Sequence, residues 1–394
     1  MRYEIKPKSL AATVFILLAA FCCTKSQHPK IEQPAEKKGK RIEWEQSTLS
    51  RISSPTANAN YSGYCRIAQL SDGSLLAVYE ADGSIVSVRS GDAGKSWSDA
   101  TVVAARKDGS NMSVPDLLVL NNNHILVFYN GRPYNISPSR KFSILARKSN
   151  DGGASWSSEQ LLYEAGHEFK NGCWEPSAIQ LPDGEIQVYF ANEGPYTDSD
   201  EQNISMLRSA DHGDSWTTSP EVVSFRPGRR DGMPVPLMLR NGAGIAVAIE
   251  DNAVNTFKPY IIKNRANGTW ASPVGAVSPN RIYALADRIA DDLYAGAPYL
   301  RQLSTGETIM SYQGTEGRTN NMNFADMKVV IGDANAENFT HKSVPFLIPA
   351  NKSCLWNSLV ILNDDTIIAV ASTNAYSSKT EVWMIKGRLI NHNK

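Results

Sequence analysis

The sequence predicts an all-β fold, a six-bladed β-propeller, from three observations. An eight-residue pattern of Ser, Asp, Gly, Ser and Trp occurs at residues 90–97, 149–156 and 209–216. A pair of apolar strands joined by a tight polar turn occurs six times, with turn residues 50 to 64 apart. No stretch shows the 3.6-residue periodicity of a long helix. Six repeats with room for four antiparallel strands each are typical of a propeller.

The repeated turn contains the residues that it needs to brace itself. In the first copy, the side chains of Asp92 and Ser96 can bond nearby backbone N–H groups, and Gly94 tolerates a left-handed backbone. Trp97 can fill the space beneath the turn. Each copy follows an alternating apolar run typical of a strand. We therefore expect Asp92, Asp151 and Asp211 to stabilise turns rather than to take part in chemistry.

The six hairpins define six units. The first runs from Arg66 to Glu80 around Gly73, and the others turn at Asn123, Gly184, Gly242, Gly306 and Asp365. Degenerate versions of the Trp turn occur at residues 267–270 and 333–339. The last unit lacks an outer strand after residues 381–390. Residues 41–52 can supply that strand and close the ring.

The N-terminal residues predict export. Arg2, Lys6 and Lys8 precede an apolar stretch at residues 10–23 that suits a signal peptide and is too short to span a bilayer. Cys22 and Cys23 suggest a bacterial lipoprotein signal in which one cysteine is lipidated, with ordinary secretion as the alternative. The expected organisation is a signal peptide at 1–23, a flexible tether at 24–42 and a propeller at 43–394. The expected location is the periplasm or cell envelope, or the outside of the cell.

The amino-acid composition limits the classes of binding partner that we expect. Forty basic and forty acidic residues give no net charge, so neither nucleic acid nor an anionic membrane surface is an expected partner. Cys65, Cys173 and Cys354 lie far apart in no metal-ligand spacing, and we expect no metal or cofactor. Eight Trp and fifteen Tyr suit sugar stacking. The predicted partner is an oligosaccharide or polysaccharide.

Polar residues gather at one end of the predicted hairpins. The start of the first strand and the end of the second lie opposite the turn, so these points share one rim across six blades. Counting back from each turn by alternation places Arg66, Asp116, Glu175 and Tyr299 on equivalent faces. A ring of acid, base and phenol around one axis is a candidate sugar site.

Two carboxylates on this rim suit glycoside hydrolysis. Glu175 follows Trp174, which can desolvate the carboxyl and raise its pKa, as a general acid requires. Glu250 ends the fourth hairpin after the apolar run 245–249 and should emerge at the same rim. One protonated and one ionised carboxyl hydrolyse glycosides. The alternative for either residue is an ordinary solvated loop carboxylate.

The three Trp turns are the Asp-box signature, and residues 45–390 resemble the sialidase superfamily of six-bladed propellers. Sialidases use an arginine triad, an Asp acid/base and a Tyr nucleophile helped by a Glu. Arg66-Ile67-Ala68 resembles their first-blade arginine motif, and Asp116 lies near the position of their Asp. Two segments depart from them: Ile249-Glu250-Asp251 stands where the second arginine belongs, and Ala297-Pro298-Tyr299-Leu300 replaces a Tyr-Ser-Cys-Leu run.

These departures resemble the exo-arabinanase family, glycoside hydrolase family 93. Trp174-Glu175-Pro176 resembles its acid/base segment, and residues 232–250 resemble its nucleophile segment. Pro298-Tyr299 and Asn357-Ser358-Leu359 are also similar. The resemblance implies an exo-acting, retaining hydrolase of a neutral glycan such as 1,5-α-L-arabinan. Glu250 would be the nucleophile and Glu175 the acid/base, with the carboxyls about 5 Å apart.

Other residues are expected to help at this site. Tyr299 would hydrogen-bond the nucleophile or the sugar ring. The expected sugar-binding residues are Arg66, Asp116, Asn130 and Arg132 for hydroxyls, Trp174 and Tyr189 for stacking, and Asp231 and Asn357 beside them.

Two alternatives stay open. One is an exo-α-sialidase in which Arg66 joins Arg132, Arg229, Arg230 or Arg318 around the carboxylate of an acidic sugar. Asp231 would then replace the glutamate that activates the tyrosine. The other is a glycan-binding propeller without turnover.

Overall fold

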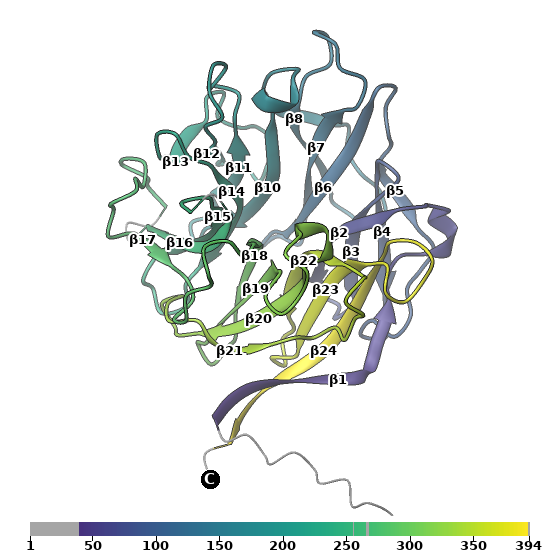
Figure 1. Ribbon diagram of the computed structural model, residues 1–394. Coiled ribbons are helices and arrows are strands. Elements are labelled where there is room, and N and C mark those ends of the chain that lie inside the picture. Colours follow the sequence, from purple (N-terminus) through teal and green to yellow (C-terminus); the bar gives the residue numbers. More distant parts are fainter. Residues whose placement is uncertain (1–38, 255, 265–267, 393–394) are drawn as a thin grey trace, which may run out of the picture. The chain divides into compact units, whose positions relative to one another are not determined.

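The computed structural model describes residues 39–392 except 255 and 265–267. Six four-stranded antiparallel sheets are arranged as blades around a central axis (Figure 1). The predicted all-β, six-bladed architecture is confirmed. The expected signal peptide, Cys22, Cys23 and most of the expected tether lie outside the described residues. Within the described ranges, no helix is long and apolar enough to cross a membrane.

The blades follow chain order, each running from an inner strand at the axis to an outer strand. The strands are β2 Ser62–Gln69, β3 Leu75–Ala81, β4 Ser84–Ser90 and β5 Thr101–Ala104 in blade 1; β6 Ser110–Val119, β7 Ile125–Pro133, β8 Ser143–Ser149 and β9 Gln160–Glu164 in blade 2; β10 Cys173–Gln180, β11 Ile186–Asn192, β12 Asn203–Ser209 and β13 Glu221–Ser224 in blade 3; β14 Asp231–Met238, β15 Ile245–Asp251, β16 Lys258–Asn264 and β17 Arg281–Tyr283 in blade 4; β18 Ala295–Gln302, β19 Thr308–Gly314, β20 Asp326–Gly332 and β21 Thr340–Ser343 in blade 5; and β22 Cys354–Ile361, β23 Ile367–Thr373, β24 Glu381–His392 and β1 Gly39–Arg51 in blade 6.

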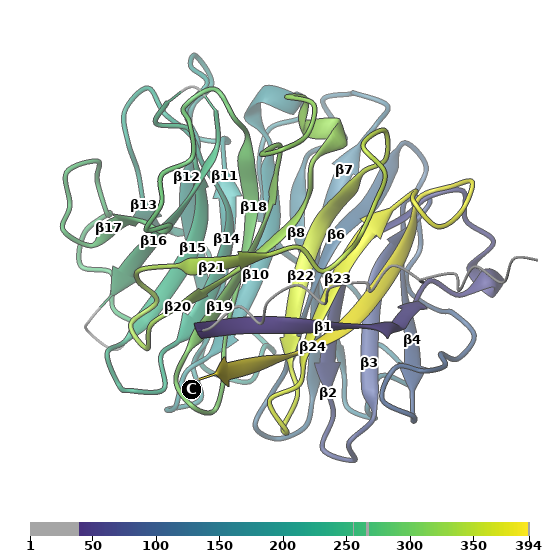
Figure 2. The same cartoon turned by 60° about the horizontal axis from the view of Figure 1, so that its bottom comes forward.

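The N-terminal strand closes the ring, as predicted. β1 pairs antiparallel with β24 as the outer strand of blade 6, which Figure 2 shows from the side. The strand begins at Gly39, before the expected start of the propeller at residue 43. Trp44 Nε1 on β1 donates to Ser343 Oγ on β21 at 3.0 Å, which joins blade 6 to blade 5. Both ends of the described chain therefore stabilise the same blade.

The three Trp turns brace themselves as predicted. In the first, Gly94 N–H donates to Ser90 Oγ at 2.8 Å, and Ser96 N–H donates to Asp92 Oδ1 at 2.9 Å. The second and third copies repeat both contacts. All three Asp carboxylates are thus occupied by their own turns.

Every inner strand carries a β-bulge at the same place. The pairing register shifts by one residue in β2, β6, β10, β14, β18 and β22, and the residue after the last regular pair has a left-handed backbone. We call these six residues the bulge ring: Tyr64, Val114, Glu175, Met233, Ala297 and Trp356, with φ between 47° and 55°. In four blades a proline follows, which suits a bulge on an edge strand because proline has no N–H to leave unpaired.

Candidate active site

The bulge ring surrounds one carboxylate with apolar groups. Its other five members pack on one another, and the rings of Tyr64 and Trp356 stack with centroids 4.5 Å apart. Burial at this place raises the pKa of Glu175, in the direction that the sequence predicts. The Trp174 ring packs against Phe142 and Phe169 and lines one cavity together with Glu175. The bulge ring adds further apolar surroundings.

In four of the six blades, the N–H of the bulge residue donates to a side chain of the preceding blade. The acceptor residue stands on the second strand, opposite the residue before the bulge; we call this place in each blade the interlock position. Glu175 N–H donates to Asn130 Oδ1 at 2.7 Å, and Ala297 N–H donates to Glu250 Oε2 at 2.9 Å. The six interlock residues are Glu80, Asn130, Ala191, Glu250, Gln313 and Ser372.

Glu250 is therefore tethered through one oxygen. Two glycines make room for its carboxylate, since a Cβ on Gly232 would lie 3.0 Å from Oε1 and one on Gly296 would lie 2.6 Å from Oε2. Burial and the negative charge of Glu175 raise the pKa of Glu250 to about 8. The interlock contact thus orients a carboxyl that holds a proton at neutral pH.

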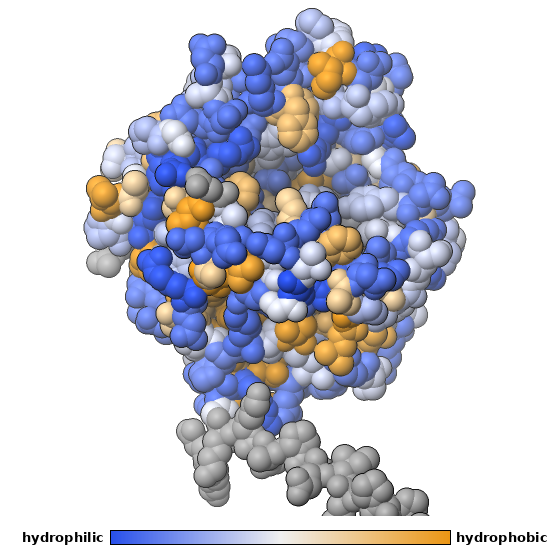
Figure 3. All heavy atoms as spheres, in the orientation of Figure 1, coloured by the Kyte–Doolittle hydropathy of each residue, from blue (hydrophilic) through white to orange (hydrophobic). Residues whose placement is uncertain are grey.

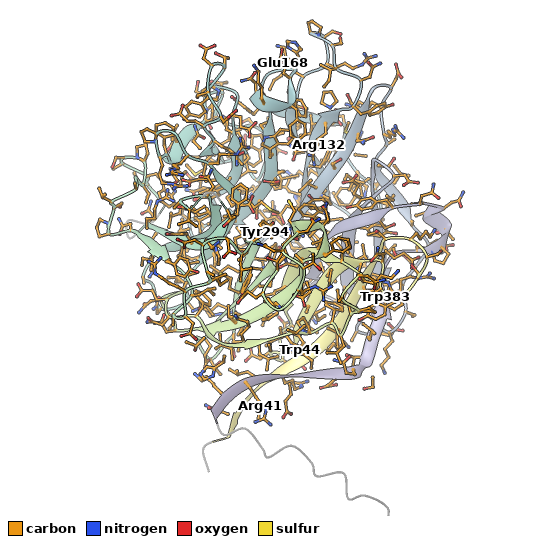
Figure 4. The ribbon with its side chains drawn as sticks, in the orientation of Figure 1. Arg41, Trp44, Arg132, Glu168, Tyr294 and Trp383 are labelled. Carbon is orange, nitrogen blue, oxygen red and sulfur yellow. The ribbon has the colours of Figure 1, made fainter. Side chains whose placement is uncertain are left out.

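Both glutamates line one cavity of about 310 Å³ at the axis. Its polar side chains include Arg132, Arg230 and Tyr294. The positive charge of Arg132 partly offsets the rise in the pKa of Glu175, and that of Arg230 partly offsets the rise in the pKa of both glutamates. Figure 4 shows Tyr294 near the centre of the ring of blades and Arg132 on the side towards Glu168. The full lining is Arg132, Phe169, Trp174, Glu175, Glu193, Gln202, Arg230, Met233, Glu250, Phe257, Tyr294, Met322 and Trp356.

The two arginines differ in their partners. Arg230 is bound by Glu193 and by Gln202 Oε1, the latter at 2.7 Å. The Arg132 guanidinium lies over the Trp174 ring, 4.8 Å from its centroid. The half-buried Arg132 can therefore offer its N–H donors to a ligand.

A larger cavity, of about 1080 Å³, opens at the other end of the axis. Among the described residues that line it, the only carboxylate is Asp183. General acid–base chemistry between two carboxyls therefore belongs to the smaller cavity. The face of the molecule that Figure 3 shows is mostly hydrophilic, with apolar side chains in separate patches.

Tyr294 was missed by sequence reasoning. Its hydroxyl accepts a hydrogen bond from Gln313 Nε2 at 2.8 Å, and burial together with the charge of Glu250 raises its pKa. It lies before the first strand of the fifth hairpin, whereas the sequence prediction considered only residues at the starts and ends of the hairpin strands. A repeated Tyr-x-Gly at Tyr61 and Tyr294 was the available signal.

Three predicted residues lie outside this cavity. Arg66 Nε is 3.9 Å from Asp116 Oδ1, and the Arg66 guanidinium lies 4.7 Å from the Tyr299 ring centroid. The Tyr299 hydroxyl is bound by Arg301 Nη2 at 2.6 Å, not by Glu250. The prediction that Arg66, Asp116 and Tyr299 share a face with Glu175 is wrong in detail. The bulge inserts one residue, so Ser177 is their equivalent and Glu175 occupies the bulge itself.

The other predicted residues have structural partners. Tyr189 is fully buried and bonded to Gln187 and Trp270, so it cannot stack on a sugar. Asp231 is 1% exposed and bound by Arg226 and Arg281. These two predictions of direct sugar contact are wrong, because both side chains belong to the core.

Asn130 and Asn357 hold the bulges rather than line the cavity. Asn130 Nδ2 donates to Cys173 O at 2.8 Å in addition to the Glu175 contact, and Asn357 Nδ2 donates to Ala297 O at 3.1 Å. Both side chains are buried. Their effect on a substrate would be indirect.

The predicted arginine cluster is incomplete in the cavity. Arg318 donates to backbone carbonyls, including Lys352 O at 2.6 Å, and Arg229 donates to Asn252 O at 3.4 Å. Of the predicted arginines, only Arg132 and Arg230 line the cavity. Within the described ranges, no group of three metal-ligating side chains was found, and the three cysteines are buried and free.

Comparison with known proteins supports this architecture. No family model matches the chain. The sequence is 28% identical over 203 residues to a sialidase of Micromonospora viridifaciens, a match that covers 48% of this chain and 30% of the sialidase. The chain therefore spans about a third of the length of that relative.

Two solved structures share the fold. The α-L-arabinanase of Penicillium chrysogenum, complexed with arabinobiose, has a TM-score of 0.66 at 18% identity. The α-L-arabinofuranosidase of glycoside hydrolase family 93 from Fusarium graminearum, also complexed with arabinobiose, has a TM-score of 0.66 at 17% identity. Each match covers 86% of this chain and 97% of the other. The chain is therefore similar to these two glycoside hydrolases in its propeller fold, and part of its sequence is similar to that of a sialidase.

Proposed function

We propose that this protein is an exo-acting, retaining glycoside hydrolase that cleaves a neutral arabinofuranose glycan such as 1,5-α-L-arabinan. The observation that carries the proposal is the pair of carboxyls, half-buried Glu175 and buried Glu250, which line one cavity and have raised pKa values. Two proteins of this fold have been solved with arabinobiose, which supports the sugar class.

The tether on Glu250 suggests which oxygen reacts. Ala297 N–H holds Oε2, so Oε1 attacks the anomeric carbon and forms a glycosyl ester while the glycosidic C–O bond breaks. Glu175 gives its proton to the departing oxygen. In the second half-reaction Glu175 takes a proton from water, whose oxygen displaces Glu250 and restores the configuration.

The proton must lie on Glu175 when the first bond breaks. In the free protein, burial and the Glu175 charge favour the proton on Glu250, whose pKa is about 8. Positive charge that develops at the anomeric carbon stabilises an ionised Glu250 beside it. Approach to the transition state therefore favours transfer of the shared proton to Glu175.

The surrounding side chains suit a sugar ring. Arg132 can donate to hydroxyls while lying on Trp174, and the Tyr294 hydroxyl lies beside Glu250. Phe169 is 66% exposed and adds an apolar surface at the same cavity. Polar donors beside aromatic faces are typical of carbohydrate sites.

The direct test is hydrolysis of linear arabino-oligosaccharides and of sialyllactose by the purified protein, with NMR detection of the first-formed anomer. We expect arabinose or a short arabino-oligosaccharide released with retained configuration, and loss of that activity in Glu250→Gln. Release of the inverted anomer, or full activity in Glu250→Gln, would refute the nucleophile assignment.

The second candidate is an exo-α-sialidase. It is favoured by Arg132 and Arg230, which place two positive charges in the cavity, and by the sequence similarity to a sialidase. Arg230 is already paired with Glu193, which leaves less charge for an acidic sugar. Cleavage of sialyllactose but not of arabino-oligosaccharides would select this candidate.

We also propose that the protein is exported and attached to the membrane through a lipid on Cys22 or Cys23. The charged and apolar N-terminal sequence supports this proposal. Replacement of both cysteines by Ser should move the protein from the membrane fraction to the soluble fraction of cells. An unchanged distribution would remove the lipid anchor from the proposal.

A further inference from the structure

The larger of the two axial cavities, which we call the lower cavity, differs in its lining from the active-site cavity. Phe169, Trp174 and Trp356 bring aromatic rings to the active-site cavity. Among the described residues that line the lower cavity, none is aromatic. Its walls carry aliphatic or thioether side chains from four blades: Ile67, Leu117, Val119, Leu237, Met238 and Ile361. Such walls suit an aliphatic chain better than the face of a sugar ring.

The mouth of the lower cavity is held together by glutamines at the ends of three inner strands. Gln180 Oε1 accepts from Asn121 N–H of the preceding blade at 2.8 Å, and Gln302 Oε1 accepts from Arg240 N–H at 2.9 Å. Gln69 makes the equivalent contact to blade 6 at 3.0 Å. Because these contacts join neighbouring blades at the mouth, the cavity is formed before a ligand enters, which lowers the entropic cost of binding.

Arg301 lies at the inner end of the lower cavity. Its guanidinium is 4.4 Å from the ring centroid of Tyr299, and Tyr299 lines a small space next to Glu175 of the bulge ring. Arg301 Nη1 donates to Leu300 O at 2.7 Å, and Nη2 donates to the Tyr299 hydroxyl at 2.6 Å. A guanidinium has five N–H donors, so the half-buried Arg301 keeps donors for a ligand.

The positive charge of Arg301 is not balanced by a carboxylate in contact with it. The buried Asp116 carboxylate is paired with Arg66, whose Nε lies 3.9 Å from Oδ1. Among the described residues, Arg301 forms no ion pair. Arg240 adds a second positive charge at the mouth, where Asp183 is the single carboxylate among the described lining residues. The charge of the cavity is therefore complementary to an anion.

We propose that the lower cavity binds an aliphatic carboxylate, with the carboxylate on Arg301 and the chain along the apolar walls towards the mouth. The two oxygens of a carboxylate match the planar donors of a guanidinium. The chain gains free energy because its apolar surface and that of the walls leave water. This binding site is separate from the paired glutamates and does not rest on the proposed hydrolase activity.

The first test uses sodium octanoate below the concentration at which it forms micelles. Met238 lines the lower cavity, whereas Met233 and Met322 line the active-site cavity. In protein labelled with 13C at the methionine methyl groups, octanoate should shift the NMR signal of Met238 and leave those of Met233 and Met322 in place. Replacement of each methionine by Leu assigns the three signals.

The second test is calorimetric titration of two arginine variants with octanoate. Arg301→Gln removes the charge at the inner end and should weaken binding by about 10-fold or more, because a charge-assisted hydrogen bond is lost. Arg240→Gln is the matched control, since it removes an equal charge at the exposed mouth, and should weaken binding by less than about threefold. Octylammonium, with the same chain and the opposite charge, should bind the wild-type protein at least about 10-fold more weakly than octanoate.

Three results would overturn the proposal. They are a wild-type Met238 signal that octanoate leaves in place, octylammonium binding as tight as octanoate binding, and equal losses of affinity in Arg301→Gln and Arg240→Gln. The wild-type titrations decide the matter even where Arg301→Gln fails to fold. None of these results depends on whether arabinan is cleaved.

Discussion

The outer turns and the inner bulge ring use carboxylates in opposite ways. Asp92, Asp151 and Asp211 lie at the outer Trp turns, where Ser hydroxyls and backbone N–H groups lower their pKa values. Glu175 and Glu250 lie at the axis, where burial raises their pKa values. The three Asp residues recur at one place in the repeat, whereas Glu175 occupies a bulge position and Glu250 an interlock position. The outer turn therefore stabilises an ionised acid where donors converge on it, and the inner ring prepares an acid for chemistry where donors are few.

The largest expected effect, on kcat, distinguishes an interlock residue that takes part in the reaction from one that only holds a neighbouring blade. Glu250→Gln keeps an oxygen that can accept from Ala297 N–H but removes the nucleophile, so kcat should fall by roughly 10³-fold or more. Glu80→Gln makes the same change at the interlock position of blade 1, which lies outside the cavity lining. It should alter kcat by less than about threefold. Equal losses in the two variants would show that the interlock contact, not the reaction, is what the assay detects.

The next effect tests how closely Glu250 is held. In Gly296→Ala the new methyl would lie 2.6 Å from Glu250 Oε2 and 2.5 Å from the Tyr294 hydroxyl, so both side chains must move. We expect kcat to fall by about 10- to 100-fold, since a displacement of about 1 Å is enough for such a loss.

Gly63→Ala is the control for that steric effect. The equivalent methyl in blade 1 would lie 2.2 Å from the Tyr61 hydroxyl, away from both glutamates. It should lower the melting temperature with little change in kcat. A larger loss of kcat in Gly63→Ala than in Gly296→Ala would contradict the placement of the reaction beside Glu250.

The raised pKa of Glu250 predicts a stability effect with a definite sign. The folded state binds a proton up to about pH 8, whereas the unfolded state releases it near pH 4.3. The free energy of unfolding should therefore fall as the pH rises from about 5 to 8. Glu250→Gln should flatten this slope and raise the melting temperature at pH 8, and calorimetry across this range would measure both. A slope that survives in Glu250→Gln would have to arise from other groups.

The outer turns could be predicted in full from the sequence, and the inner ring only in part. A turn braced by Asp92 and Ser96 is local, so its residues can be recognised within eight positions. The same period gave the number of blades and the closing role of residues 41–52. Glu175 and Glu250 were found because strand starts and strand ends meet at one rim.

The β-bulge is the reason why the rest of the site prediction was wrong. Period-two alternation assigns Tyr299 and Glu175 to one face, but the extra residue in each inner strand separates them. The sequence does contain a signal of the bulge, because a proline inside a strand marks an edge or a bulge. Four inner strands have such a proline: Pro115, Pro176, Pro234 and Pro298.

The smallest expected effect comes from the outer turns and has the opposite pH sign. Asp211 accepts from Ser215 N–H at 2.8 Å, and its pKa is lowered to about 2, below the unfolded value near 3.9. Its contribution is present above about pH 4 and is lost as the pH falls towards 2. Asp211→Ala should lower the melting temperature at pH 7 by about 2 °C, with less effect near pH 2, and should leave kcat unchanged. This turn is exposed and lies on the outer part of its blade, whereas the paired glutamates lie at the axis. A change of kcat in Asp211→Ala would therefore mean that the outer turns and the bulge ring do not act independently.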